Sequence, residues 1–354
     1  MCRNTFVTML IILITVTLLA GCGGDSVKPE YSVKVGLVAD TGGIGDRSFN
    51  ATAWKGVEDA RNDMGIRGAY LESQVPADYE LNTRRFLDQN YELIISVGFP
   101  QADATRAAAE ANPDRKFAIV DYAYDPVLPN VMGMTFKSDE AAFLAGYLAA
   151  GMSETGKVGT FGGMQIPPVT IFMVGMEKGV QHYNSQKGTN VQFIGWKTDP
   201  ASSACGAGRF TETFVSLEKG RLFANQLMDE GADIIVPLAG TTGIGAASAI
   251  KDRAKMMIGV DSDQYISTPD YKEIYLTSIL KNSDKACYDV IKTVVNTAFM
   301  GGTYTGTLKN SGVGIAPYHD FQDRIPAALK SEIEQLKKDI IDGKVTTVWA
   351  DCQK

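Results

Sequence analysis

The sequence predicts an α/β protein with two doubly wound lobes, each built on a mostly parallel sheet. Short apolar runs alternate with helical patterns along most of the chain, which indicates parallel strands joined by right-handed crossovers. Most apolar runs are continuous rather than alternating, so both faces of each sheet should be covered. Ten such runs, with a break near residues 139–155, indicate two lobes.

The individual elements follow from these runs and from the amphipathic stretches between them. We expect strands at residues 33–39, 68–73, 93–99, 117–122, 131–136, 158–162, 191–196, 233–238, 256–260 and 274–280. We expect helices at residues 48–64, 100–111, 138–152, 168–186, 217–230 and 283–300, among others.

The first 22 residues have the pattern of an export signal. Arg3 precedes an apolar run at residues 6–19 that is too short for a membrane-spanning helix. The run ends in LAGC, with Cys22 after small residues, as in a bacterial lipobox whose cysteine carries a diacylglycerol; the alternative is an ordinary signal peptide with an incidental cysteine. We therefore expect a lipid anchor on Cys22, a flexible tether at residues 23–30, and a folded part on the extracytoplasmic side of the cell membrane.

Charge and composition exclude several classes of function. The formal net charge of −7 argues against binding to nucleic acid. His182 and His319 are too few and too far apart for a histidine metal site, and no C-x-x-C pair is present, so we expect no metal. Two of Cys205, Cys287 and Cys352 could form a disulfide in an exported chain, and the sequence does not say which.

A glycine-rich pattern of the form G-I-G-x-x-S occurs twice, at residues 43–48 and 243–248, each time after an expected strand. One interpretation is a nicotinamide-dinucleotide fingerprint, and hence an oxidoreductase, but both copies have serine where that motif has its third glycine. The second is a ligand cleft in which two strand-to-helix turns face each other. The third is a pair of tight turns with no role in ligand binding.

Five segments in collinear order resemble the basic membrane protein (BMP) family of lipoproteins. They are residues 38–50 (VADTGGIGDRSFN), 117–121 (FAIVD), 140–146 (EAAFLAG), 239–245 (AGTTGIG) and 258–264 (IGVDSDQ), the last followed by LTSILK at 276–281. The resemblance implies a type I periplasmic binding protein fold, with two Rossmann-like lobes joined by a hinge. We expect residues 31–136 with about 262–300 to form the N-terminal lobe, and residues 137–261 with about 301–354 to form the C-terminal lobe.

The family resemblance also implies which residues bind the ligand. Phe49 would stack on a nucleobase, although its spacing alone favours a core phenylalanine that packs under the turn. Asn50 would orient the base or the sugar, or else serve as a cap or turn residue. Asp121 would accept N–H bonds from the base, because a carboxylate at the end of a parallel strand points into the ligand crevice. Asp40 has the same placement, but it could instead form a simple Asx-turn.

Two further charged residues follow later strands. Asp261 and Lys281 would bind the ribose hydroxyls through charge-assisted hydrogen bonds, or else form a structural salt bridge. Gly240, in the fourth segment, completes the expected ligand-binding set. Nucleoside-binding relatives are expected to carry an aromatic residue near Val236, where this chain is aliphatic. We therefore expect another wall for the base, such as Phe172 or Phe214.

The resemblance to the basic membrane protein family implies the substrate-binding protein of an ABC transporter rather than an enzyme. It would capture a small polar ligand, a purine nucleoside by resemblance, and present it to the transporter permease, without a cofactor. The alternatives are a sensory binding protein for a sugar or another small ligand, and the nicotinamide-dependent oxidoreductase considered above.

Overall fold

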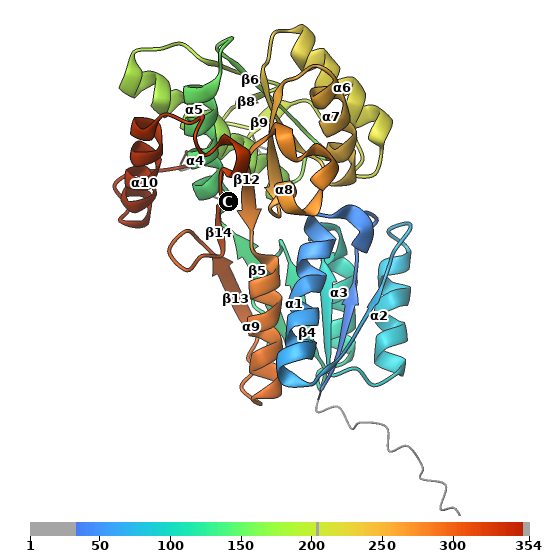
Figure 1. Cartoon of the computed structure of the whole chain (residues 1–354). Helices are drawn as coiled ribbons and strands as arrows, with labels where there is room; N and C mark the ends of the chain where they lie inside the picture. Colours follow the sequence, from blue (N-terminus) through green and yellow to red (C-terminus); the bar gives the residue numbers. More distant parts are fainter. Residues whose placement is uncertain (1–32, 203–204, 350–354) are drawn as a thin grey trace, which may run out of the picture. The chain divides into compact units, whose positions relative to one another are not determined.

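The computed structural model describes residues 33–202 and 205–349, which form two α/β lobes (Figure 1). The expected signal peptide, its Cys22 and the tether at residues 23–30 lie outside the described residues. Within the described residues, no helix is both long enough and apolar enough to cross a membrane.

The N-terminal lobe is built on a parallel sheet with strand order β13-β5-β4-β3-β1-β2, all within the described residues. The central strand β3 is completely buried, as its mostly apolar sequence predicts, whereas the edge strand β2 is half-exposed. The strands are β1 (Lys34–Val38), β2 (Arg67–Leu71), β3 (Leu93–Val97), β4 (Lys116–Val120), β5 (Val131–Phe136) and β13 (Gly302–Gly306).

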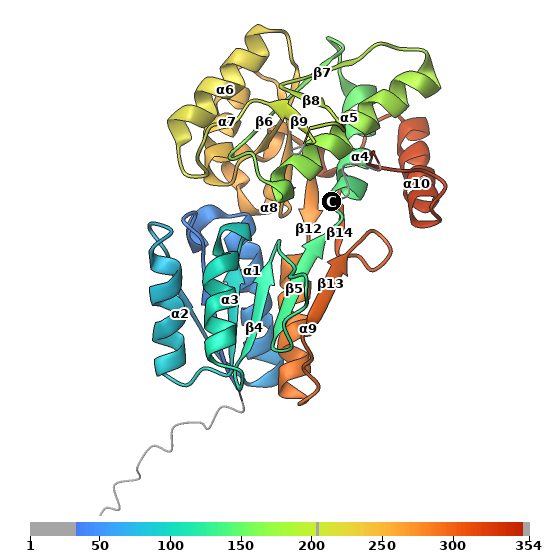
Figure 2. The same cartoon turned by 180° about the vertical axis from the view of Figure 1, so that it is seen from behind.

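Helices cover both faces of this sheet (Figures 1 and 2). One face packs against α1 (Phe49–Met64) and α9 (Ser283–Val295), and the other against α2 (Asp78–Asp88) and α3 (Ala102–Ala111). Gly56 allows α1 and α9 to approach closely, because a Cβ atom at this position would lie 2.2 Å from the carbonyl oxygen of Asp284. Short 3₁₀ helices, η1 (Ile44–Asp46) and η2 (Phe99–Gln101), follow β1 and β3.

The C-terminal lobe has a second sheet, with order β14-β12-β11-β10-β6-β7 in the described part of the chain. All its pairs are parallel except β12 with β14. The strands are β6 (Lys157–Gly162), β7 (Gln192–Ile194), β10 (Ile234–Leu238), β11 (Met256–Asp261), β12 (Tyr275–Lys281) and β14 (Val313–Ile315), with a separate ribbon of β8 (Trp196–Thr198) and β9 (Gly206–Gly208).

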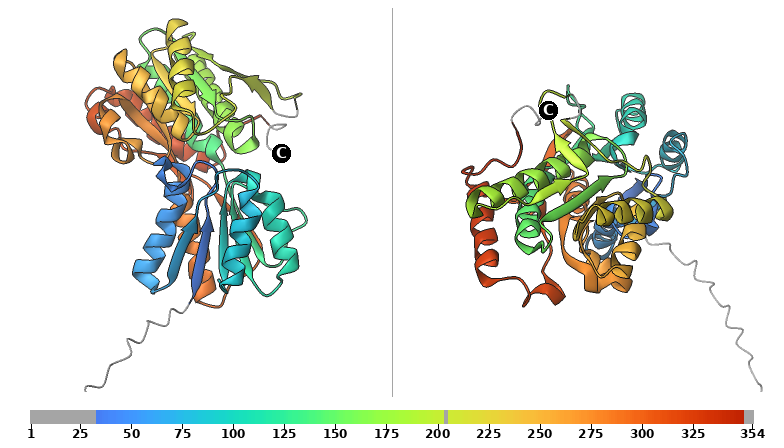
Figure 3. Two further views of the ribbon diagram at one scale, coloured as in Figure 1. Left: turned by 90° about the vertical axis from the view of Figure 1, so that its right-hand side faces the viewer. Right: turned by 90° about the horizontal axis from the view of Figure 1, so that it is seen from above.

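Both faces of the second sheet are also covered (Figure 3). One side carries the longest apolar helices together with the last helix of the chain, and the other side carries four shorter elements. The first group is α4 (Ser138–Met152), α5 (Pro167–Lys187), α10 (Ala327–Ile341) and η4 (His319–Phe321); the second is α6 (Leu217–Asp229), α7 (Thr241–Asp252), α8 (Gln264–Ser267) and η3 (Pro269–Ile274).

The predicted α/β class with two doubly wound lobes is confirmed, and every expected strand overlaps an observed one. The second glycine-rich segment differs from its expected turn. Gly243 and Gly245 lie inside α7, whose preceding turn is at Gly240 instead. Gly245 packs there against α6, because an added Cβ would lie 2.0 Å from the carbonyl oxygen of Leu217. Its role is helix packing, so the two glycine patterns are not equivalent.

Three crossings of the chain join the lobes in the described residues, near 137, near 282 and at 307–312. The crossings lie side by side: the N–H of Lys137 donates to Gly306 O at 2.8 Å, and the N–H of Asn282 donates to Gly312 O at 2.9 Å. Sheet membership differs from the expected lobe boundaries, because residues 275–281 form β12 of the C-terminal sheet and residues 302–306 form β13 of the N-terminal sheet. An apolar run identifies a strand but not the sheet that the strand joins.

Candidate functional site

A cavity of about 270 Å³ lies between the lobes, at the carboxyl ends of both sets of parallel strands. This volume is just below the roughly 300–1,000 Å³ typical of small-molecule sites. All the residues expected from the sequence to bind a ligand line it. They are Asp40, Phe49, Asn50, Asp121, Gly240, Asp261 and Lys281.

The fold explains why these charged residues meet. Asp40 and Asp121 follow β1 and β4, while Asp261 and Lys281 are the last residues of β11 and β12. Parallel strands that end at the same edge direct these residues toward one crevice. Asp121 and Asp261 have backbone φ angles of 65° and 66°, in the left-handed region that L-residues rarely adopt. Such local strain is concentrated at functional sites in proteins.

Lys281 is the centre of a buried ionic cluster. Its Nζ lies 2.7 Å from Asp121 Oδ2 and 3.7 Å from Asp261 Oδ1. The side chains of Lys281 and Asp121 are only 4% and 7% exposed, so water screens their attraction weakly. The ammonium also lies 5.0 Å from the ring centre of Phe49 and 5.1 Å from that of Phe172, which favours the charged form.

The protonation of the cluster follows from these contacts. Burial disfavours the Lys281 ammonium, but the nearby carboxylates of Asp121 and Asp261 outweigh burial, so the pKa of Lys281 is raised and the side chain is charged. Burial raises the pKa of Asp121, and the charge of Lys281 acts in the opposite direction. Burial likewise raises the pKa of Asp40. Among its described residues the cavity therefore contains more carboxyl groups than cations, and its one ammonium, that of Lys281, is already paired with carboxylates.

Asp40 and Asn50 are tied to each other. Asp40 Oδ1 accepts from the N–H of Gly42 at 2.7 Å, which is the Asx-turn considered from the sequence, and from Asn50 Nδ2 at 2.6 Å. Asn50 Oδ1 in turn accepts from the N–H of Asp40 at 3.0 Å. Asn50 is almost completely buried, so it orients Asp40 within the protein. Among the described residues nothing donates to Asp40 Oδ2, the oxygen left for a ligand.

Asp46 is a cavity residue that the sequence reasoning did not single out. Its carboxylate accepts from the backbone N–H groups of Ser48, Asn50 and Ala51 at 2.7–3.1 Å, and thus caps the start of α1. Burial raises the pKa of Asp46 to about 6, and these hydrogen bonds oppose the shift. The sequence signal for this role was an acidic residue just before the helix expected at residues 48–64.

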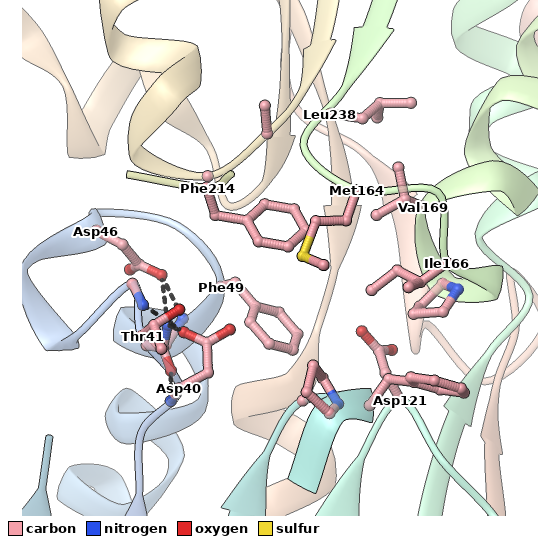
Figure 4. Close-up of a pocket in the computed structure, with 18 of the residues that line it drawn as sticks. Asp40, Thr41, Asp46, Phe49, Asp121, Met164, Ile166, Val169, Phe214 and Leu238 are labelled. Carbon is pink, nitrogen blue, oxygen red and sulfur yellow. Dashed lines mark hydrogen bonds between the residues drawn. The ribbon is translucent and has the colours of Figure 1, made fainter. Parts of the chain in front are cut away.

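Two aromatic side chains approach the cavity from opposite lobes. Figure 4 shows Phe49 beneath Phe214, with Met164 beside the Phe214 ring and with Asp40 and Asp121 on either side of Phe49. Phe49 is half-buried and also touches the core of the N-terminal lobe, so both interpretations of this residue apply in part. Phe172 lines the cavity too, but it is 3% exposed and faces Lys281.

The position of Phe214 depends on its close approach to Gly163 and on a backbone hydrogen bond at the start of α7. A Cβ atom at Gly163 would lie 2.3 Å from the Phe214 ring, so only glycine leaves room for it. Gly240 has a φ of 52° and begins α7, and the nearby N–H of Thr242 donates to Phe214 O at 3.0 Å. Val236, by contrast, is fully buried in β10. The second aromatic wall therefore comes from a loop and not from a strand.

The remaining lining residues lie mostly on loops, where the sequence gives little signal. They include apolar side chains from the C-terminal lobe and residues at the rim of the N-terminal lobe. Those not predicted are Thr41, Gly42, Pro76, Tyr79, Gly98, Phe99, Pro100, Met164, Ile166, Pro168, Val169, Glu212, Thr213, Leu238, Ala239, Thr241 and Val260.

The first glycine-rich turn is occupied by an acidic side chain. The N–H of Ile44 donates to Glu72 Oε1 at 2.9 Å, and a carboxylate there repels a phosphate. With the second glycine pattern inside α7, neither copy forms a dinucleotide cradle. In the described part of the chain no group of three metal-ligating side chains is present. Cys287 is a buried free thiol whose pKa is raised by burial, and Cys205 is disulfide-bonded.

The fold and the cavity define a two-lobed binding protein of the type I periplasmic class, with a cavity for a small ligand between its lobes. The chain belongs to the PnrA-like family of ABC transporter substrate-binding proteins, whose family model matches residues 33–347. This is a family of transporter components and not of enzymes, which removes the oxidoreductase alternative.

Curated relatives agree with this assignment. The ABC transporter nucleoside-binding protein BmpA of Lactococcus lactis is 32% identical, over 95% of this chain and 96% of that protein. Basic membrane protein A of Borreliella burgdorferi is also 32% identical, over 95% and 94%. An uncharacterized lipoprotein of Pyrococcus horikoshii is 33% identical, over 85% of this chain and 74% of that protein.

Solved structures support the same fold. The crystal structure of an ABC transporter solute-binding protein from Aeropyrum pernix is similar, with a TM-score of 0.79 and 28% identity over 89% of this chain and 92% of that chain. The dimeric Lac repressor shares the fold alone, with a TM-score of 0.57 and 13% identity over 80% and 97%.

Proposed function

We propose that this substrate-binding protein captures a purine nucleoside in the cavity between its lobes and delivers it to an ABC transporter permease. The observation that carries the proposal is the meeting of two aromatic rings, three strand-end carboxylates and one ammonium in a single cavity. Rings suit a flat base, and the charged groups suit the N–H and hydroxyl groups of a nucleoside. The nucleoside-binding relative from Lactococcus lactis supports the same ligand class.

The base would lie between Phe49 and Phe214, which approach from opposite lobes. Asp121 and Asp40 would accept hydrogen bonds from its N–H groups, since Asp121 Oδ1 and Asp40 Oδ2 accept none from the described residues. Asn50 would act through Asp40 rather than on the ligand, because its amide is bonded inside the protein.

The sugar would lie near Asp261 and Lys281, where a carboxylate can accept from one hydroxyl and the ammonium can donate to the other. The salt-bridge interpretation of Lys281 is compatible with this role, because the ammonium has three donors and its bond to Asp121 uses one. The backbone of Gly240, at the start of α7, would border the ligand on the side of the C-terminal lobe.

Isothermal titration calorimetry with adenosine, guanosine, inosine, cytidine and free ribose tests the ligand class. We expect saturable binding of purine nucleosides and much weaker binding of ribose, because ribose lacks the stacking surface. Binding of ribose or another sugar, with no heat from any nucleoside, would reject the nucleoside proposal.

Replacement of Phe49 tests the stacking role. Stacking of a base on an aromatic side chain contributes about 1–3 kcal/mol, so Phe49→Ala should weaken nucleoside binding by roughly 5- to 150-fold. Phe299→Ala is the matched control, because Phe299 is also half-buried in the N-terminal lobe but does not line the cavity. A loss of stability in Phe49→Ala without a loss of affinity would favour the core interpretation.

We also propose that Cys22 carries a lipid that anchors the protein to the extracytoplasmic side of the cell membrane. The lipobox-like sequence supports this, and so does the lipoprotein among the relatives. Cells that express Cys22→Ser should release the protein from the membrane fraction and fail to incorporate labelled palmitate. Equal membrane retention and labelling of the two forms would point to an ordinary signal peptide.

A further inference from the structure

Two consecutive residues of the N-terminal lobe are hydrogen-bonded to three consecutive residues of the C-terminal lobe. Ser48 Oγ lies 3.0 Å from Val260 O and 3.1 Å from Asp261 Oδ2, and Ser262 Oγ donates to Arg47 O at 3.0 Å. We call these five residues the clasp. Ser48 does not line the cavity, so its hydroxyl group is not placed to contact a bound nucleoside directly.

The hydroxyl of Ser48 is available for this contact because another residue performs its usual task. Ser48 is the N-cap residue of α1, where a serine oxygen normally accepts a backbone N–H of the first turn. Here Asp46 accepts those N–H bonds, and the Ser48 side chain forms none of them. Ser48 is also completely buried, so its hydroxyl would be costly to leave without a partner.

The backbone on both sides of the clasp is held in an unusual conformation. Arg47 has a φ of 56° and Asp261 a φ of 66°. Neither residue is a glycine, so each needs surrounding contacts to persist in the left-handed region. The clasp supplies such contacts, since Arg47 O and the Asp261 carboxylate each accept a hydrogen bond from a serine hydroxyl of the opposite lobe.

We infer that Ser48 is a positioning residue that holds Asp261 in its ligand-facing orientation when the two lobes close. Ser48 Oγ shares its one proton between Val260 O and Asp261 Oδ2, while Oδ1 faces Lys281 Nζ at 3.7 Å, so the carboxylate is contacted from two sides. Donor and acceptor belong to different lobes, so these bonds form only when the lobes are together. The inference rests on the proposed role of Asp261 in nucleoside binding. It adds that Ser48 links this role of Asp261 to closure of the two lobes.

Ser48→Ala tests the inference, with adenosine, guanosine and inosine as the probes. Loss of a buried hydrogen bond to a charged group should weaken nucleoside binding by about 10-fold, mainly through faster dissociation. In an Asp261→Asn background the same substitution should have little further effect, because the two residues act as a unit. Ser96→Ala is the matched control: Ser96 is buried and accepts from Thr105 Oγ1 inside the N-terminal lobe, and its loss should leave affinity unchanged.

Wild-type affinity in Ser48→Ala, or additive losses in the double variant, overturn the inference. Small-angle X-ray scattering separates this failure from a failure of the nucleoside proposal. If the wild-type protein binds none of the nucleosides, the proposed function fails. Scattering then still tests whether the clasp holds the two lobes together. A larger radius of gyration for Ser48→Ala than for Ser96→Ala then supports the clasp, and equal values overturn it.

Discussion

Replacing Lys281 with methionine removes the one positive charge from the buried cluster while keeping a side chain of similar length. The substitution leaves Asp121 and Asp261 without their shared counter-charge. We expect a large loss of folding stability at neutral pH, because two carboxylates would then face each other in a site from which water is largely excluded.

The size of the loss follows from the geometry. With an effective dielectric constant near 20, charges at 2.7 and 3.7 Å attract by about 6 and about 4.5 kcal/mol. Transfer of the Lys281 ammonium from water into the folded protein costs several kcal/mol, so only part of this attraction stabilises the fold. The net destabilisation expected from breaking such a buried pair is about 3–5 kcal/mol.

Urea unfolding of Lys281→Met and the wild-type protein at pH 5 and pH 7 measures the effect. Burial already raises the pKa of Asp121, and loss of Lys281 removes the charge that opposes this rise. An acid with a raised folded-state pKa stabilises the fold when protonated, so the defect should shrink as the pH falls. The double variant Lys281→Met with Asp121→Asn should recover part of the loss at pH 7.

The matched control is Lys285→Met. Its Nζ lies 2.7 Å from Asp289 Oδ2, the same separation as between Lys281 and Asp121, but both side chains are more than 40% exposed. Solvent screens this pair, so its loss should cost less than about 1 kcal/mol. Equal effects of the two substitutions, or a Lys281→Met defect that does not change with pH, would refute the reasoning.

Two further predictions concern the walls of the cavity and the cap of α1. Gly163→Ala should displace the Phe214 ring, which lies 2.3 Å from the added Cβ, and weaken nucleoside binding at least several-fold in calorimetry; Gly302→Ala, which meets no atom within 4 Å, should bind normally. Burial raises the pKa of Asp46 from 3.8 to about 6, so its protonation stabilises the fold below about pH 4, and this contribution is lost as the pH rises through about 6. Asp46→Asn should therefore remove about 2 kcal/mol of the stability change between pH 4 and pH 7 in urea unfolding; an unaltered pH dependence would contradict the assignment.

The strands and the strand-end charges were predictable because they depend on local pattern. A continuous apolar run such as 117–120 has few structural solutions other than a buried strand, and a charge placed directly after it, such as Asp121, must leave the core. Parallel strands then bring such charges to one edge, which is why Asp121, Asp261 and Lys281 meet in the cavity although 160 positions separate the first from the last.

Other features depend on tertiary partners that the sequence does not show. Asn50 has the donor and acceptor groups of a ligand-binding residue, but Asp40 and Asp46 lie close enough to occupy them. Phe214 could be named only as one of two candidates, because its position is set by a loop and by the space at Gly163. The lobe to which residues 275–281 belong was decided by pairing of β12 with β11, a long-range contact.

The three adjacent crossings have a consequence for how such a molecule can be divided. β12 belongs to the C-terminal sheet, but α9 and β13, which follow it in the chain, belong to the N-terminal lobe. Neither lobe is therefore encoded by one uninterrupted stretch of the gene. A single cut between codons cannot release either half intact, and exchange of one half between related genes would need several simultaneous junctions. New ligand preferences are therefore expected to arise by substitution within the cleft rather than by swapping halves.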